Sequence, residues 1–261
     1  MCQMNSRGDR GANQKVALDL LAQAATTGAD LAVLPEYTDY LGPGRDAPSP
    51  EPVDGPYLAA FADAAAAHRM WVVAGSFHEA GAGGGRTYNT SVVFDRAGTV
   101  TATYRKIHLY DVEIAGRVSF HESRSVAAGD TPVTVDVEGV RVGLSICYDL
   151  RFPELYRRLV DDGAQVLLAP SAFMLHTGRD HWEVLLRARA IENQCYVVAA
   201  AQIGDHEPGR TCYGRSMIID PWGLVLAQAP DEVGVTVGDL DVARLRRIRA
   251  ELPSLTHRRL P

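Results

Sequence analysis

Residues 140–160 read VRVGLSICYDLRFPELYRRLV, and the change of pattern inside this stretch decides the fold class. Val140 to Ile146 is a short apolar run, as in a buried strand. Pro153 to Val160 has the apolar spacing of a helix, which should stop near Gly163. A strand that leads into a helix is the unit of α/β folds, so we expect an α/β protein with Cys147 at the junction.

The same order of elements occurs twice along the chain. In the first half, helical spacing alternates with short apolar runs and then a hairpin, over Asn13–Thr27, Leu31–Leu34, Leu58–Met70, Trp71–Gly75, Tyr88–Phe94 and Val100–Tyr104. The second half continues from Pro153–Val160 with Val166–Ala169, Trp182–Asn193, Tyr196–Ala201, Ser216–Ile219 and Leu224–Ala227. Helices that alternate with apolar strands imply covered sheets, so we expect two such halves packed face to face.

The two hairpins share a short motif, which supports the idea of two equivalent halves. Val92-Val93-Phe94-Asp95-x-x-Gly98-x-Val100 matches Met217-Ile218-Ile219-Asp220-x-x-Gly223-x-Val225. No low-complexity linker divides the chain. We therefore expect residues 1–261 to form a single domain.

Composition argues against several classes of function. A formal net charge of −6 gives no basic surface, so we expect neither nucleic acid nor a membrane as a partner. No signal peptide opens the chain and no apolar run reaches transmembrane length, which predicts a cytoplasmic location. The four cysteines have no metal-ligand spacing, so we expect reduced thiols and no metal site.

Three chemically capable side chains stand where strand-like runs end. Glu36 follows Leu31–Leu34, Lys106 follows Val100–Tyr104, and Cys147 follows Val140–Ile146. Strand ends are where an α/β sheet presents side chains to a ligand. A carboxylate, an ammonium and a thiol that meet there can together attack an amide carbonyl.

The junction at Cys147 predicts a thiol with a lowered pKa. A free thiol has a pKa of about 8.5, and helix N-termini and cations lower it. Lowering the pKa by about 1.5 takes roughly 2 kcal/mol. One ammonium about 4 Å away supplies about 4 kcal/mol at an effective dielectric constant near 20, so Lys106 suffices if it lies close.

Each of these residues also has a plainer interpretation. Most free cysteines are small buried hydrophobes, and we interpret Cys195 and Cys212 in that way. Glu36 and Lys106, taken singly, would be ordinary surface charges. The stretches of sequence around these residues, taken together, favour a functional site.

That joint sequence resembles the nitrilase superfamily of carbon–nitrogen hydrolases, whose catalytic triad is Glu-Lys-Cys. The matching stretches are Leu34-Pro35-Glu36, Tyr104-Arg105-Lys106-Ile107-His108-Leu109, Ile146-Cys147-Tyr148-Asp149-Leu150-Arg151-Phe152-Pro153-Glu154 and Asp220-Pro221-Trp222-Gly223. His181–Gln202 is similar to the Nit branch of amidases. The resemblance covers nearly the whole chain. It implies a four-layer α-β-β-α sandwich that dimerises by stacking sheets, with no metal and no organic cofactor.

The resemblance also implies a role for each matching residue. Cys147 would be the nucleophile that forms a thioester, and Glu36 the base that passes the thiol proton to the departing amine. Lys106 and the backbone N–H of Tyr148 would hold the oxyanion. Glu122 matches a second family glutamate that positions the lysine or the substrate, and is otherwise a solvated loop acid.

The resemblance implies that the substrate is a small-molecule amide. Ser171–Trp182 resembles the family's substrate loop, where we place Phe173 and Thr177 against the acyl chain. Arg179 in the same loop is either a new carboxylate ligand or a solvated residue.

The Nit branch divides chiefly between amidases for deaminated glutathione and ω-amidases for small monoamides such as α-ketoglutaramate and succinamate. His181–Gln202 is closer to the first group, whereas Arg117–Ser123 leans toward the second. We expect deaminated glutathione or a similar 2-oxo-acid γ-amide.

Other interpretations stay open. A Cys-His site would use one of the eight histidines, of which His108, His176 and His181 lie near the key segments. A non-catalytic interaction protein on the same fold would be expected if a triad position were replaced, and all three are present. A metalloenzyme is disfavoured, because there is no H-E-x-x-H or paired C-x-x-C motif.

The two ends of the chain carry one expectation each. Met1-Cys2-Gln3-Met4 enters the family's first strand late, so we expect a shortened strand at the edge of one sheet. Leu252–Pro261 has no helical or strand pattern of its own. By resemblance, it would pack on the neighbouring subunit of a homodimer.

Overall fold

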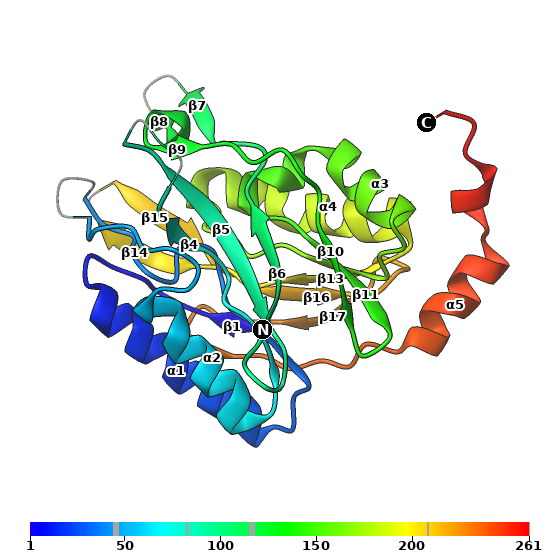
Figure 1. Cartoon of the computed structure of the whole chain (residues 1–261). Coiled ribbons are helices and arrows are strands. Elements are labelled where there is room, and N and C mark those ends of the chain that lie inside the picture. Colours follow the sequence, from blue (N-terminus) through cyan, green and yellow to red (C-terminus); the bar gives the residue numbers. More distant parts are fainter. Residues whose placement is uncertain (44–46, 82, 84, 115–117, 208, 261) are drawn as a thin grey trace.

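Two six-stranded sheets form the body of the chain (Figure 1). The computed structural model describes residues 1–43, 47–81, 83, 85–114, 118–207 and 209–260. The first sheet contains β2 (Leu31–Val33), β3 (Trp71–Val73), β4 (Phe77–Glu79), β5 (Thr87–Phe94), β6 (Val100–Arg105) and β9 (Val126–Ala127). The second contains, in spatial order, β10 (Thr134–Val137), β11 (Val140–Leu144), β12 (Val166–Leu168), β13 (Tyr196–Ala199), β16 (Met217–Ile219) and β17 (Val225–Gln228).

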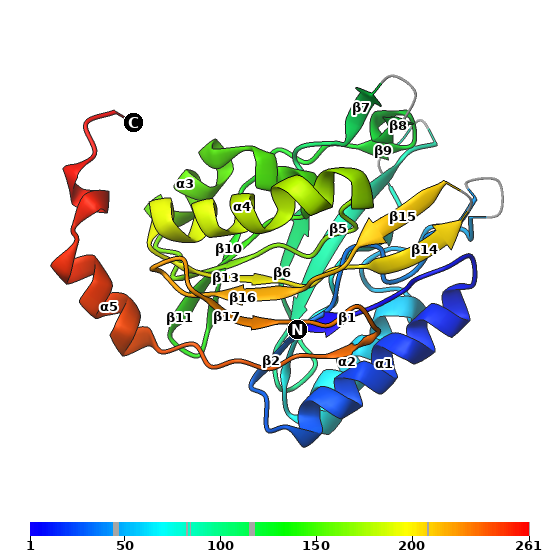
Figure 2. The same cartoon turned by 180° about the vertical axis from the view of Figure 1, so that it is seen from behind.

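Helices cover the outer faces of both sheets (Figures 1 and 2). α1 (Arg10–Thr26) and α2 (Pro56–His68) lie on the first sheet, and α3 (Pro153–Asp161) and α4 (Leu175–Asn193) lie on the second. Within β2, Ala32 belongs to the core beneath α1 and α2, whereas Val33 belongs to the core shared with the second sheet. Because both faces of the strand are buried, its sequence is a continuous apolar run. The predicted four-layer α-β-β-α sandwich is confirmed.

The two halves repeat one strand plan. β2 and β3 run parallel, then β5 and β6 add antiparallel. β12, β13, β16 and β17 repeat this arrangement in the second sheet.

The two hairpin turns, at Asp95 and at Asp220, contain the same hydrogen bonds. Asp95 Oδ1 accepts from the N–H groups of Ala97 and Thr99. Asp220 Oδ1 accepts in the same way from Trp222 and Leu224. Gly98 and Gly223 close these turns at φ values of 80° and 87°. Positive φ favours glycine, which accounts for the repeated Asp-x-x-Gly motif.

The start of the chain is a short strand, as expected, but it lies elsewhere. β1 (Cys2–Gln3) pairs antiparallel with β18 (Gly234–Val235) in a ladder of its own, not at the edge of a six-stranded sheet. The side-chain amide of Gln3 donates to the carbonyls of Pro230 and Glu232, which fixes this strand to the returning chain.

The C-terminal part contains a helix that the apolar pattern did not indicate. α5 (Val242–Glu251) is followed by a single 3-10 turn, Ser254–His257. This segment lies along one edge of the sandwich (Figures 1 and 2), where α5 buries Leu245 and Ile248. Leu252 and Leu260 are 50% and 82% exposed. Pro261 lies outside the described residues.

Two further hairpins, β7–β8 (Asp111–Ile114 and Val118–His121) and β14–β15 (Ile203–Glu207 and Arg210–Tyr213), project from one end of the sandwich (Figure 2). The sequence pattern did not indicate either of them. No helix in the described ranges is long and apolar enough to cross a membrane.

Candidate active site

The three predicted residues meet at one end of the sandwich, between the two sheets. Glu36 follows β2, Lys106 follows β6, and Cys147 comes shortly after β11. Glu122 opens the short 3-10 helix Glu122–Arg124, which comes after the β7–β8 hairpin. All four line one cavity of about 700 Å³. The strand ends therefore bring together residues that the sequence separates widely.

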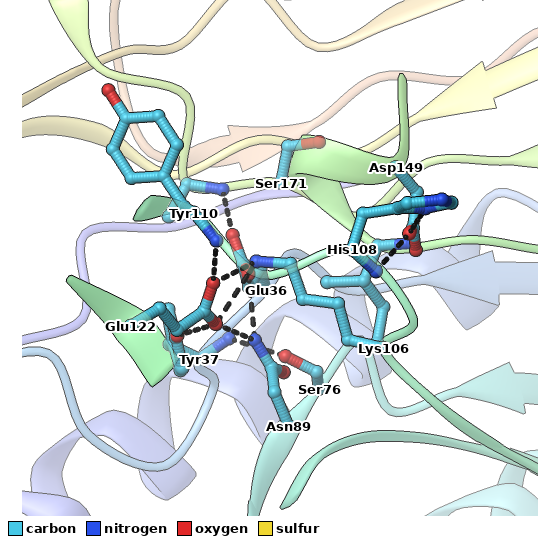
Figure 3. Close-up of polar contacts among 12 residues, drawn as sticks. Glu36, Tyr37, Ser76, Asn89, Lys106, His108, Tyr110, Glu122, Asp149 and Ser171 are labelled. Carbon is cyan, nitrogen blue, oxygen red and sulfur yellow. Dashed lines mark hydrogen bonds and ion pairs between the residues drawn. The ribbon is translucent and has the colours of Figure 1, made fainter. Parts of the chain in front are cut away.

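A buried ammonium lies between two carboxylates at the base of this cavity (Figure 3). Lys106 Nζ is 2.9 Å from Glu36 Oε1 and 2.9 Å from Glu122 Oε2. The three side chains are only 1–2% exposed. Charges this deeply buried need partners, and here each charge has one.

Neutral donors also bind the two carboxylates. Asn89 Nδ2 donates to Glu36 at 2.8 Å and to Glu122 at 3.2 Å. The hydroxyl of Tyr37 donates to Glu122 at 2.7 Å. Backbone N–H groups complete the set, from Tyr110 to Glu122 and from Ala172 to Glu36. The carboxylates are thus held in one orientation each.

The electrostatic environment keeps this cluster charged. Burial by itself lowers the pKa of the Lys106 ammonium, but Glu122 and Glu36 outweigh burial and hold that pKa well above its usual value. For Glu122, burial raises the pKa of the carboxyl, but Lys106 and the N–H of Tyr110 bring it below its usual range. Lys106 is therefore a permanent cation near neutral pH.

The loop that carries Cys147 is sharply bent. Cys147 has a φ of +47° and begins the 3-10 helix Cys147–Arg151, whereas α3 starts only at Pro153. Its N–H donates to the carbonyl of Pro170 at 2.9 Å. A non-glycine residue in the left-handed region is uncommon and marks a turn fixed by its surroundings.

Asp149 ties this turn to the segment that carries Lys106 (Figure 3). Its Oδ2 accepts from the Tyr104 hydroxyl at 2.6 Å and from the N–H of Ile146 at 2.9 Å. Its Oδ1 accepts from the N–H of His108 and lies 2.7 Å from Nδ1 of the same residue. The Cys-Tyr-Asp and Tyr-Arg-Lys-Ile-His stretches therefore hold each other in register.

The predicted lowering of the Cys147 pKa is wrong in sign. Burial raises the pKa of this thiol, and the facing carboxylate of Glu36 raises it further. Lys106 and the N–H of Ala172 lower this pKa, but by less than burial and Glu36 together raise it. The sequence indicated the cation but gave no measure of the desolvation or of the carboxylate that accompanies it. In the unliganded protein the proton therefore stays on sulfur.

Among the described residues, no histidine is one of the groups that chiefly shift the pKa of this thiol. The groups that set its pKa are Glu36, Lys106 and Ala172. His108 instead binds Asp149 and stacks on Phe152, with ring centroids 3.7 Å apart. This arrangement does not support the Cys-His alternative.

The structure brings only part of the predicted substrate loop to the cavity. Tyr148, Phe173 and Thr177 line the cavity, as expected. Arg179 does not, because it lies on the exposed face of α4. Thr177 and Arg179 are two positions apart on a helix, so their side chains point about 200° apart. Arg117 lies outside the described residues.

The cavity also contains residues to which the sequence had given no role. Arg151 follows Cys147 by four positions, and its guanidinium lies over the rings of Tyr148 and Phe173, 5.7 and 5.2 Å from their centroids. Its place in the Cys-Tyr-Asp-Leu-Arg stretch was a signal that could have identified it. Arg210 and Asn89 had no such signal, because they come from an unremarkable hairpin and strand.

The raised thiol pKa can be tested in the free protein. The rate at which iodoacetamide alkylates Cys147 should keep rising with pH beyond about 8.5, the ordinary thiol value. In Glu36→Gln the midpoint should move to lower pH, because the repelling carboxylate is gone while the Lys106 ammonium stays. Peptide mass spectrometry follows each cysteine separately.

Cys212 is an internal control for this titration. It lines the same cavity, but burial dominates its raised pKa and Glu36 contributes least among the causes. Its midpoint should move less than that of Cys147. A wild-type Cys147 midpoint below about 8 would contradict the electrostatic account.

Comparison with known proteins agrees with this geometry. Residues 1–250 match the family model described as carbon-nitrogen hydrolase. The deaminated glutathione amidase of Bos taurus is 44% identical over 99% of this chain and 81% of its own length. The crystal structure of the Caenorhabditis elegans NitFhit protein superposes with a TM-score of 0.92, at 40% identity, over 99% of this chain and 64% of that one.

A third comparison concerns the cysteine. A mutant amidase from Nesterenkonia sp., which carries acrylamide added to its active-site cysteine, superposes with a TM-score of 0.78 at 27% identity, over 97% of this chain and 96% of that one. Family model, full-length relatives and fold agree. The chain belongs to the carbon–nitrogen hydrolase family, hydrolases that act on carbon–nitrogen bonds other than peptide bonds.

Proposed function

We propose that residues 1–261 act as a single amidase domain with Glu36, Lys106 and Cys147 as catalytic residues and Glu122 as their positioning residue. The observation that carries this proposal is the placement of the Glu36 carboxylate. One of its oxygens binds the Lys106 ammonium, and the same carboxylate acts directly on the Cys147 thiol. Base and cation are thus in contact, and the nucleophile lines the same cavity, before substrate arrives.

In the first step Glu36 takes the thiol proton as sulfur attacks the amide carbon. The raised pKa of the thiol means that thiolate does not accumulate beforehand, so proton removal accompanies attack. The carbonyl oxygen becomes an oxyanion beside the Lys106 ammonium and the N–H of Tyr148. Glu36 then gives its proton to the departing nitrogen. The carbon–nitrogen bond breaks, the amine leaves, and a thioester remains on Cys147.

In the second step water replaces the amine. Glu36, again ionised, takes a proton from water as its oxygen attacks the thioester. The carbon–sulfur bond breaks, the sulfur recovers the proton, and the acid product leaves. Lys106 keeps its charge throughout because Glu122 remains beside it at 2.9 Å.

Substitution of Cys147 tests the nucleophile. Cys147→Ala should abolish turnover without unfolding the chain, and Cys147→Ser should lose more than about 1,000-fold in kcat, since a hydroxyl is a far weaker nucleophile here. In Glu36→Gln, mass spectrometry of the protein mixed with substrate should find an acyl group on Cys147. Normal turnover in Cys147→Ala, or an acyl group on Cys195 or Cys212, would end the proposal.

For the substrate we propose deaminated glutathione or a similar γ-amide of a 2-oxo acid, rather than α-ketoglutaramate or succinamate. Support comes from the relatives of that name and from the size of the cavity. About 700 Å³ lies well within the range of sites for drug-sized ligands and exceeds what a small monoamide fills. Arg151 beside Phe173 can hold the 2-oxo-acid carboxylate next to Cys147.

One kinetic comparison tests the substrate. We expect kcat/KM for deaminated glutathione to exceed the values for α-ketoglutaramate and succinamate by at least about tenfold, which corresponds to about 1.4 kcal/mol in transition-state binding. The three substrates should be measured with one enzyme batch. A tenfold preference for the small amides would make the chain an ω-amidase and leave the thioester mechanism intact.

A homodimer and a cytoplasmic location complete the proposal. Four large apolar side chains, Val184, Ile191, Trp222 and Leu224, are 50–67% exposed. Val184 and Ile191 lie two helical turns apart on α4, and a Cβ added at Gly223 would lie 2.6 Å from the Ile191 side chain, so these residues form one patch. The four buried free thiols support a reducing compartment.

Sizing with light scattering tests the dimer. The wild-type protein should have the mass of a dimer at micromolar concentration, and the double variant Val184→Glu with Ile191→Glu should have that of a monomer, because two charges cannot be buried unpaired. Val16→Glu, at an exposed position on α1, is the matched control and should stay dimeric. A monomeric wild-type protein would refute the dimer.

A further inference from the structure

A second guanidinium besides that of Arg151 lines the cavity. Arg210 begins β15 and lines the cavity. Its Cζ lies 4.8 Å above the ring centroid of Phe120, on β8 of the other hairpin. The two hairpins, which lie at the same end of the sandwich (Figure 2), therefore meet through Arg210 and Phe120.

The donors of Arg210 are weakly engaged. Its Nη1 lies 3.6 Å from Glu207 Oε1, beyond the 2.7–2.9 Å typical of a charge-assisted hydrogen bond. By contrast, Arg105 reaches Glu79 at 2.6 Å and Arg215 reaches Asp231 at 2.6 Å. A guanidinium stacked on a ring keeps its N–H groups in plane and available. With five donors, Arg210 can keep Glu207 on one edge and take an anion on the other.

A row of aromatic rings separates the two arginines. Arg151 contacts Tyr148, Tyr148 contacts Tyr110 with centroids 5.0 Å apart, and Tyr110 contacts Phe120 at 5.8 Å. Arg210 lies at the other end of this row. Cys147 is adjacent to Tyr148 in sequence, nearer the Arg151 end. Arg151 and Arg210 are therefore the two ends of this series of contacts, and both line the cavity that contains Cys147.

We propose that Arg210 binds the terminal carboxylate of the leaving amine. This inference rests on the proposed function, in which the leaving group is a dipeptide. An extended dipeptide reaches about 7 Å and ends in a carboxylate, which suits the planar fork of an arginine. The enzyme then holds its substrate by a carboxylate at each end, with the scissile amide between them. Ammonia, the leaving group of a small monoamide, makes no use of Arg210.

The experiment compares deaminated glutathione with the same molecule whose terminal carboxylate is converted to a carboxamide. The wild-type enzyme should prefer the free acid in kcat/KM by about 10- to 100-fold. Arg210→Met, which keeps an unbranched chain against Phe120, should remove most of this preference, chiefly through KM. Arg210→Lys should restore part of it. Arg179→Met, an exposed arginine outside the cavity, is the matched control and should keep the wild-type preference.

Each alternative outcome has its own meaning. If Arg210→Met keeps the wild-type preference, or lowers kcat/KM for both compounds equally, Arg210 only stabilises the contact between the hairpins. The inference is then wrong, and the proposed function stands. If the wild-type enzyme hydrolyses α-ketoglutaramate but neither larger compound, the proposed substrate is wrong and the Arg210 subsite fails with it.

Discussion

The ammonium of Lys106, buried between Glu36 and Glu122, is the interaction on which the rest of the site depends. An unpaired charge at 2% exposure is untenable, and removing one partner of such a group typically costs about 3–5 kcal/mol. The partners come from different parts of the chain, the end of β2 and the 3-10 helix Glu122–Arg124. Pairing them with Lys106 fixes both segments against the end of β6. The base of the cavity is therefore a consequence of neutralising one cation.

The same arrangement sets the chemistry. Glu36 steadies Lys106 and at the same time opposes ionisation of Cys147, so the resting site has a charged lysine and a protonated thiol. Such a site does not hold a free thiolate exposed to unrelated electrophiles. In the proposed mechanism, its reactivity depends on a carbonyl arriving beside Lys106, where the cation stabilises the developing oxyanion. Electrostatics and geometry thus act on the transition state rather than on the resting enzyme.

Several outcomes differ from the sequence-based expectations for identifiable reasons. Arg179 was left as either a carboxylate ligand or a solvated residue, and because α4 begins at Leu175, helical phase turns it outward. The thiol pKa was expected to fall because the pattern indicated a cation, whereas burial and a carboxylate dominate. Asn89 binds both carboxylates, yet it stands in a strand among ordinary polar residues and had no distinguishing context. The β7–β8 and β14–β15 hairpins, which bring Arg210 to the cavity, had no clear alternation.

The sequence by itself determined the main strands and helices of the two equivalent halves and picked out Glu36, Lys106 and Cys147 as candidate residues. Periodicity and strand-end position are local properties, so they can be read along the chain. Tertiary structure alone decided which charges are paired, which side chains face the cavity and the direction of each pKa shift. Lys106 and Glu36 are 70 positions apart, and Ala172 and Glu36 are 136 apart. Burial and contact between such distant residues exist only once the two sheets have packed together, and those two quantities control the electrostatics of the site.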